Sequence, residues 1–107
     1  MRPFALTTLR DHHGERGELY DEFLRVDSLS AGMYVLPAGE PDPQTPHDQD
    51  ELYVVLAGSA SFTAADETIR VGAGTTIFVP AHEVHEFHDV TERLEVVVVF
   101  APPESTQ

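Results

Sequence analysis

Short segments rich in β-branched and aromatic residues run along most of the chain, separated by glycine, proline and polar residues. Such segments are typical of strands, and glycine and proline mark the turns between them. No window of about 11 residues keeps apolar side chains at i, i+3, i+4 and i+7, so we expect at most one helical turn, near residues 19–24. The eight predicted strands span residues 22–29, 32–36, 52–56, 59–63, 68–71, 76–79, 84–88 and 94–100.

Two turn signals predict hairpins between these strands, one at Gly58-Ser59 and one at Ala64 to Glu67. The run 94–100 is apolar on both faces after Glu95 and predicts a central strand covered on both sides. We therefore expect an all-β fold, a small antiparallel barrel of jelly-roll type. It would form a single domain over 1–107, with its core at about 22–101, an N-terminal arm at 1–21 and a frayed polar tail at 102–107.

The composition fits a folded domain with an acidic surface. The 107 residues are 41% hydrophobic, and the side chains expected in the core are Phe62, Phe78, Phe87, Val54, Leu56, Val96, Val98 and Phe100. Nineteen acidic residues against six arginines give a formal charge of -13, which would repel nucleic acid and anionic membranes. No apolar run reaches the roughly 18 residues of a membrane span, so we expect a cytoplasmic protein.

Two missing residue types exclude whole classes of chemistry. The chain has no lysine, which excludes Schiff-base enzymes and P-loop nucleotide hydrolases. It also has no cysteine, which excludes disulfides, thiol catalysis and thiolate metal sites. Histidine, carboxylate and amide oxygens are therefore the ligands available to a metal ion.

Three of the six histidines fall within residues 82–88, but two familiar motifs do not fit them or the nearby serines. His82-Glu83-Val84-His85 places the second histidine one residue too early for the HExxH helix of zinc proteases. Gly58-Ser59-Ala60-Ser61 is not the GxSxG turn of a serine hydrolase. We expect His82 and His88 to lie outside the barrel, and His12 and His13 to be solvated.

A first pattern lies in residues 39–58, where His47 precedes Glu51 by four residues and Glu51 precedes Gly58 by seven. A second lies in residues 74–89, where Gly74 and Pro80 precede His85. Together and in this order they resemble the two cupin motifs, G(x)5HxH(x)3-4E(x)6G and G(x)5PxG(x)2H(x)3N. The resemblance covers residues about 30–101 and implies a cupin barrel.

The chain departs from the first motif at one ligand position. Thr45 stands where cupins have their first histidine, and threonine is a poor ligand for a divalent metal. Gln44, one residue earlier, is the most plausible substitute if the prolines on either side bend the chain. The alternative is that the Gln44 amide simply bonds backbone groups in a proline-rich turn.

The expected site is a metal centre inside the barrel. His47 and Glu51 can both point inward, and His85 can meet them from a neighbouring strand. Two imidazoles and one carboxylate suit Fe(II) and also accept Mn, Co, Ni or Zn, with Gln44 as a weak fourth ligand and Asp50 as a weak candidate to orient a histidine. The alternative is a polar cluster held together by hydrogen bonds without a metal.

Other polar and aromatic residues have both a functional and a purely structural interpretation. Tyr34, Tyr53 and Phe87 are candidates for the substrate pocket, although core packing is the simpler interpretation for them. Asp42, Asp48 and Asp50 form an acidic run, which we interpret as a solvated loop whose negative charge would also favour cations at the mouth of the barrel.

Three functions are compatible with these residues, because cupin barrels carry many activities. The first is a metal-dependent enzyme acting on a small organic molecule, with a dioxygenase-type reaction as one candidate. The second is a small-molecule-binding module without turnover. The third is a metal-free isomerase or cyclase in which Glu51 or a histidine acts as general acid or base. The resemblance also implies a homodimer, with a strand near residues 23–26 pairing with a neighbour's sheet.

Overall fold

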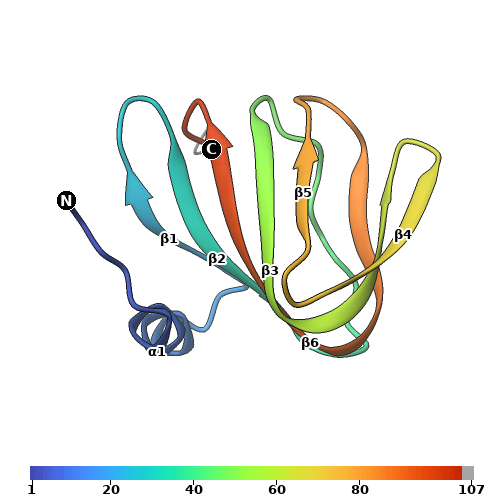
Figure 1. The fold of residues 1–107 in the computed structure, drawn as a ribbon, viewed down its shortest axis with the longest axis horizontal. Coiled ribbons are helices and arrows are strands. Elements are labelled where there is room, and N and C mark those ends of the chain that lie inside the picture. The colour runs from blue at the N-terminus through green and yellow to red at the C-terminus, as the bar shows by residue number, and fades with distance from the viewer. Residues whose placement is uncertain (105–107) are drawn as a thin grey trace.

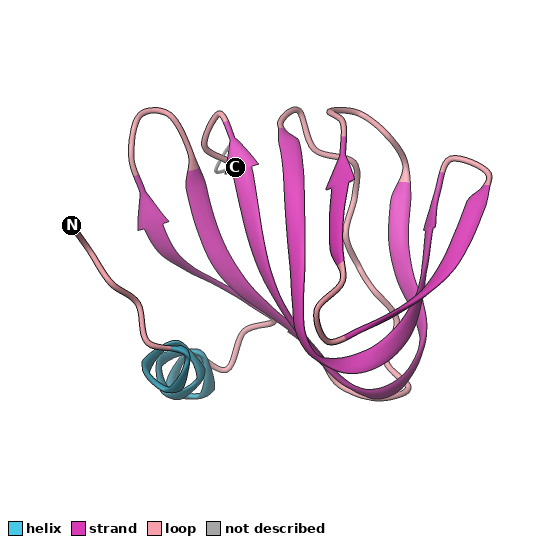
Figure 2. Ribbon diagram, viewed as in Figure 1, coloured by secondary structure: helices cyan, strands magenta, loops and turns pink. Residues whose placement is uncertain are grey.

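The computed structural model describes residues 1–104 and consists of strands with one helix at the N-terminal end (Figures 1 and 2). This confirms the all-β prediction. The strands are all paired antiparallel in the order β1-β2-β6-β3-β4, and β5 also pairs with β3. The elements are α1 (Leu6–Arg16), β1 (Tyr20–Arg25), β2 (Ser30–Leu36), β3 (Asp50–Ala64), β4 (Glu67–Gly72), β5 (Thr76–Val79) and β6 (His85–Ala101).

Two long strands, β3 and β6, form the backbone of the barrel and correct the predicted strand count. They pair from Asp50 opposite Ala101 to Ala64 opposite His85, with register shifts between residues 55 and 61. The predicted strands 52–56 and 59–63 are therefore one strand, as are 84–88 and 94–100. Figure 1 shows that β3 and β6 curve strongly, so that one half of each strand lies on one side of the barrel and the other half on the opposite side.

Gly58 is a bend inside β3, so the hairpin predicted at Gly58-Ser59 is wrong. Its φ is +100°, and a Cβ atom there would lie 2.2 Å from the Arg93 carbonyl oxygen. Glycine is required here because β6 passes close to this residue, and the chain does not reverse direction at it. The hairpin predicted at Ala64 to Glu67 is confirmed, because these two residues pair across the β3–β4 turn.

The barrel interior is filled by alternating side chains of both halves. The buried core includes Tyr34, Leu36, Tyr53, Val55, Phe62, Val79, Phe87, Leu94, Val96, Val98 and Phe100. Phe78 is 62% exposed and is not a core residue, because alternation along β5 turns its neighbour Val79 inward and Phe78 outward. Val54 and Leu56 are likewise only partly buried, since they alternate with the inward Tyr53 and Val55.

An 11-residue helix, α1, was not predicted, and the segment expected to be helical is strand β1. Leu9 is its one buried apolar residue, and it packs with partly buried Leu6 against Met33 and Val35 on the outer face of β2. The rest of the helix is polar, so its hydrophobic periodicity is weak. Gly17 ends the helix in the left-handed conformation, with its N–H bonded to the carbonyl of His13.

Two histidines of α1 attach the helix to the barrel, and the expected solvation is wrong for His13. His13 is buried, and its Nε2 lies 2.8 Å from the carbonyl oxygen of Leu19. His12 is half exposed and pairs with the buried carboxylate of Asp21 on β1. The predicted outer position of His82 agrees with the structure, where its side chain is exposed.

The first residues of the predicted frayed tail are attached to the barrel. The Glu104 backbone N–H donates to Ser30 Oγ at 2.9 Å, and Arg25 donates to the Glu104 carbonyl oxygen at 2.8 Å. Residues 105–107 of that predicted tail lie outside the described residues. No helix within residues 1–104 is long and apolar enough to cross a membrane.

Candidate functional site

Three candidate ligands converge inside the barrel from different elements. Glu51 lies at the start of β3, His85 at the start of β6, and His47 in the loop before β3. His85 Nε2 is 3.3 Å from Glu51 Oε1, and His47 Nε2 is 4.0 Å from the same oxygen. Glu51 is only 1% exposed, so its carboxylate faces the interior and these two imidazoles.

Two buried atoms of this cluster have no hydrogen-bond partner within residues 1–104. They are His47 Nε2 and Glu51 Oε2. Buried polar atoms are nearly always paired, and leaving one unpaired costs about 1–3 kcal/mol. Unpaired acceptor and imidazole atoms at one point inside a barrel are what a ligand-binding or metal-binding site presents before its ligand is bound.

The proton on His85 can be assigned from its partners. Nδ1 lies 2.7 Å from the carbonyl oxygen of Glu83, which can only accept, so Nδ1 carries the proton. Nε2 is then the ring nitrogen that faces Glu51 and Tyr53. The Glu83 carbonyl does the orienting that the sequence suggested for Asp50, whose carboxylate is exposed and accepts the Ala81 N–H instead.

The pKa of His85 reflects two opposing influences. Burial disfavours the charged imidazolium, whereas hydrogen bonds to Glu51 and to the Glu83 carbonyl and the charges of Glu51 and Asp42 favour it. The favourable interactions outweigh the burial, and the pKa of His85 is raised above its ordinary value. In the absence of a metal ion, this imidazole is suited to hold a proton next to Glu51.

A chain of hydrogen bonds joins His85 to the loop before β3. The Tyr53 hydroxyl lies 2.9 Å from His85 Nε2 and 3.1 Å from Gln44 Oε1. The other end of the Gln44 amide, Nε2, donates to Asp42 Oδ2 at 3.0 Å. Because Asp42 takes the amide nitrogen, the Gln44 carbonyl oxygen is the atom turned toward the site. Thr45, at the position of the missing motif histidine, is exposed.

Asp42 is the residue that sequence analysis missed. The expected solvated carboxylate is buried and accepts hydrogen bonds from Tyr34 Oη at 2.6 Å, from Phe87 N at 2.9 Å and from both nitrogens of Gln44. These donors come from β2, β6 and the loop itself, so only the folded chain brings them together. A clue was present in the clustered prolines around it, which restrict the loop backbone.

The pocket aromatics divide into two groups. Tyr34 and Tyr53 have buried hydroxyls bonded to Asp42 and to Gln44, and burial raises the pKa of both phenols far above their usual value. They stay protonated and act as hydrogen-bond donors. Phe87 is fully buried and packs against the rings of Tyr53 and Phe62, with centroids 5.2 and 4.7 Å apart. It supports the site from the core.

Two cavities reach the cluster, and Gln44 lines both. One of about 260 Å³ lies beside His85 and is bordered by Pro46 and Thr63. The other, of about 100 Å³, lies beside His47 and is bordered by Tyr20 and Glu104. Each histidine therefore borders one of the two cavities, and Gln44 borders both.

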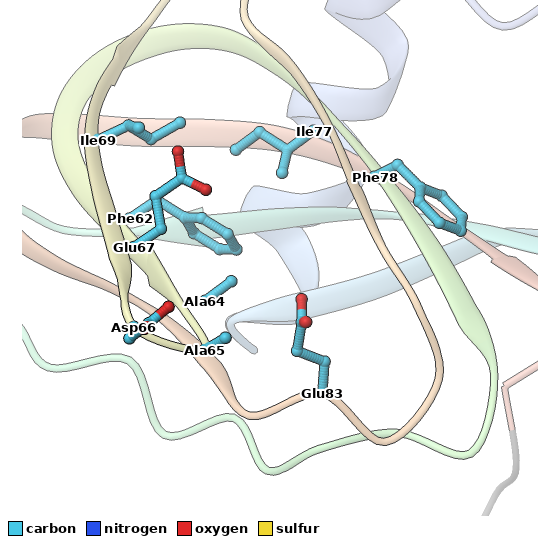
Figure 3. A pocket seen from close by; sticks show the side chains of 9 residues that line it. All are labelled: Phe62, Ala64, Ala65, Asp66, Glu67, Ile69, Ile77, Phe78 and Glu83. Carbon is cyan, nitrogen blue, oxygen red and sulfur yellow. The ribbon is translucent and has the colours of Figure 1, made fainter.

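A third hollow, of about 230 Å³, lies between β4 and β5 (Figure 3). Phe62, Ile69 and Ile77 face it, whereas the ring of Phe78 points away. Phe62 separates it from the cluster, because that ring packs 5.7 Å from Tyr53 and 5.9 Å from His85 on its inner side. This hollow contains none of the predicted ligands.

The cluster fits a metal ion in its chemistry and only in part in its spacing. Two ligands of one transition-metal ion lie about 3.0–3.4 Å apart when each bond is about 2.1 Å. The 3.3 Å between His85 and Glu51 meets this requirement, whereas the 4.0 Å to His47 does not. Within residues 1–104 no group of three His, Cys, Asp or Glu side chains is placed closely enough to hold an ion. His47 would have to move toward Glu51 to complete the set.

Comparison with known proteins places the chain in a family. The model of the Cupin domain family matches residues 32–100, which include every predicted ligand. The chain is a cupin. Residues 1–31, with α1 and β1, and Glu104 lie outside the matched segment.

A curated relative extends the similarity beyond the family segment. An uncharacterized protein of Streptomyces coelicolor is 44% identical over 105 residues, which cover 98% of this cupin and 100% of that protein.

Solved structures support the fold. An RmlC-like cupin family protein of Methanocaldococcus jannaschii, with a double-stranded β-helix fold, is 21% identical with a TM-score of 0.70, covering 78% of each chain. The DMSP lyase DddQ of Ruegeria pomeroyi is 24% identical with a TM-score of 0.69, covering 81% of this chain and 49% of that one. The predicted jelly-roll cupin barrel is thereby confirmed.

Proposed function

We propose that this cupin binds a small organic molecule inside its barrel, next to a divalent transition metal held by His47, Glu51 and His85. The observation that carries the proposal is the pair of unpaired buried atoms, His47 Nε2 and Glu51 Oε2, beside His85 Nε2. Fe, Mn, Ni or Zn would suit two imidazoles and one carboxylate. When bound, such an ion would supply Lewis acidity and, if it is iron, a site for O₂.

The residues around this position have separable tasks. Glu83 orients His85 through its carbonyl oxygen, and Asp42 orients Gln44 so that a carbonyl oxygen faces the site. The Tyr53 hydroxyl lies between His85 and Gln44 and can donate its hydrogen bond to either of them. Glu51 is the one fully buried carboxylate at the centre, so it is the group that would hold or move a substrate proton. Oxygenation of an enol, diketone or phenol is one reaction that this arrangement could support.

A second candidate is acid–base chemistry without a metal, such as an isomerase or cyclase. It is favoured by the Tyr53 hydroxyl, which already lies 2.9 Å from the metal-binding nitrogen of His85, and by the raised pKa of that imidazole. In this arrangement His85 and Glu51 would exchange a proton with the substrate. A third candidate, binding without turnover, would use the same cavities.

Elemental analysis of untagged protein, purified without chelators, separates these candidates. We expect a near-stoichiometric transition metal in the wild type and its loss in Glu51→Gln and His85→Ala. His82→Ala, which removes an exposed histidine three residues before His85, is the matched control and should keep the metal. Wild-type protein that is metal-free and resists loading would contradict the metal proposal.

Activity assays with candidate substrates then distinguish the reaction classes. An oxygenase should consume O₂ and lose that activity on chelation. An acid–base enzyme should turn over substrate whether or not chelator is present. A binding module should take up a ligand and release it unchanged.

A further inference from the structure

A small cavity beside His47 has a wall that the family segment does not contribute. Its volume is about 100 Å³, and it is lined by His47, Gln44, Tyr20, Tyr34 and Glu104 together with apolar Val98 and Phe100. Tyr20 belongs to β1 and Glu104 follows β6, and both lie outside the matched residues 32–100. The known motifs therefore do not account for this side of the site.

The ring of Tyr20 reaches the cavity by crossing Gly32 on the neighbouring strand. A Cβ atom at Gly32 would lie 2.2 Å from Tyr20 Cζ and 2.4 Å from its hydroxyl oxygen. Only glycine leaves room for the ring in this position. The ring then packs edge-on against Phe100, with centroids 6.1 Å apart. The position of the Tyr20 hydroxyl is thus built into the sheet.

The Tyr20 hydroxyl is buried and unpaired. It has no hydrogen-bond partner within the described chain, as is also true of His47 Nε2 on the same cavity. Burial and the charges of Glu104, Glu22 and Glu51 raise the pKa of Tyr20, so its hydroxyl stays protonated and can donate. On the same cavity, the carboxylate of Glu104, whose Oε1 lies 3.7 Å from His47 Nδ1, can accept a hydrogen bond.

The Tyr20 hydroxyl and the Glu104 carboxylate restrict the charge of an occupant. A carboxylate could accept from Tyr20 but would lie beside the carboxylate of Glu104. An amidinium or ammonium group would suit that carboxylate but has no lone pair to accept from Tyr20. A neutral group that both accepts and donates, such as a hydroxyl, an enol or a primary amide, satisfies both kinds of atom.

We propose that the cavity beside His47 binds the neutral oxygen-bearing head group of the ligand, and that Tyr20 is the residue that selects it by donating a hydrogen bond. This inference rests on the proposed function, because it places the head group in the same site. It adds the chemical class of the ligand and a specificity-determining residue contributed by β1.

Three isosteric probes of different charge test the inference: acetamide, acetate and acetamidinium. Each has four non-hydrogen atoms, so binding in the millimolar range is expected. The chelator-treated protein would carry ¹³Cζ-labelled tyrosine, and Tyr20→Phe identifies the Tyr20 signal among the three tyrosines. We expect acetamide to shift the signals of Tyr20 and of the His47 ring, and the two ions to leave them unchanged at the same concentration.

A variant series adds an independent measurement. Tyr20→Phe should weaken acetamide binding about threefold to tenfold, as expected for one neutral hydrogen bond. Glu18→Gln, an exposed change two residues before Tyr20, is the control and should leave binding unchanged. Stronger binding of acetate or acetamidinium, or acetamide binding that leaves the Tyr20 signal unmoved, would overturn the inference.

The result is separable from the metal proposal because the titration needs no metal. Metal retained by the wild type, together with acetamide that misses Tyr20, would overturn this inference alone. Acetamide bound at Tyr20 in a protein that resists metal loading would support it and overturn only the metal assignment.

Discussion

The carboxylate of Asp42 fixes which end of the Gln44 amide faces the site. Gln44 Nε2 donates to Asp42 Oδ2 at 3.0 Å, which leaves Gln44 Oε1 3.1 Å from the Tyr53 hydroxyl. An amide can be a useful acceptor or metal ligand only if its oxygen, and not its nitrogen, points inward. The role suggested for Gln44 by the sequence therefore depends on a second residue.

Asp42→Asn should disturb both stability and the orientation of Gln44. Oδ2 accepts from Gln44 Nε2 and Phe87 N, and Oδ1 accepts from Tyr34 Oη, so an NH₂ group at either position faces existing donors. We expect a loss of about 2 to 4 kcal/mol in the free energy of unfolding. Urea unfolding measures this loss, and the Gln44 side-chain ¹⁵N–¹H₂ signals should move.

Asp48→Asn provides the control, because the Asp48 side chain is 78% exposed. It should change the stability by less than about 0.5 kcal/mol. Equal effects of the two substitutions would mean that the network around Asp42 contributes nothing specific.

The sequence revealed Gln44 but not Asp42 for a physical reason. Gln44 stands next to a motif position, so its spacing to His47 and Glu51 can be counted along the chain. Asp42 receives its hydrogen bonds from strands β2 and β6, whose residues 34 and 87 are far from it in sequence. A carboxylate between two prolines has the same local pattern whether it is solvated or buried.

The same limit explains two of the errors in secondary structure. Glycine followed by serine is compatible with a hairpin and with a bend, and the choice at Gly58 depends on the carbonyl of Arg93 from another strand. Helix α1 buries only one apolar side chain, Leu9, so it is held by contacts with β2 and not by a hydrophobic stripe. Apolar character, by contrast, is visible locally, and the predicted core residues Phe62, Phe87, Val96, Val98 and Phe100 are buried.

Gly58→Ala should be strongly destabilising. The new Cβ would lie 2.2 Å from the Arg93 carbonyl oxygen, and the φ of +100° is one that alanine rarely adopts. We expect a loss of at least about 3 kcal/mol. Gly72→Ala is the matched control, since its Cβ would meet nothing closer than 3.7 Å. Comparable melting temperatures for both variants would contradict the close passage of β6.

The homodimer implied by the family resemblance has a clear place in this fold. Strand β1 is an edge of the sheet, because the strand order begins with it and, among residues 1–104, it pairs only with β2. An unpaired edge can be covered by a strand of a second copy. Light scattering coupled to gel filtration should give about twice the 11.8 kDa chain mass. A species of 11.8 kDa at every concentration would remove the dimer.

The three tyrosines make alkaline unfolding a direct test of the buried polar network. The chain has no lysine and no cysteine, so its tyrosines are the side chains that titrate between about pH 9 and 12. Burial raises the pKa of Tyr20, Tyr34 and Tyr53, and the bond to Asp42 raises that of Tyr34 further. Phenolate should therefore appear only as the protein unfolds.

The sign and size of the pH dependence follow from linkage. A group whose pKa is higher in the folded state contributes stability that is complete below its unfolded pKa, near 10 for tyrosine, and is lost as the pH rises above it. Each tyrosine removes about 1.4 kcal/mol per pH unit, so three remove about 4 kcal/mol per unit. In chelator-treated protein, phenolate absorbance and far-UV circular dichroism should change together, well above pH 10. Tyr34→Phe should reduce the slope by about a third, whereas gradual phenolate formation near pH 10 with an unchanged dichroism spectrum would show that the hydroxyls are exposed.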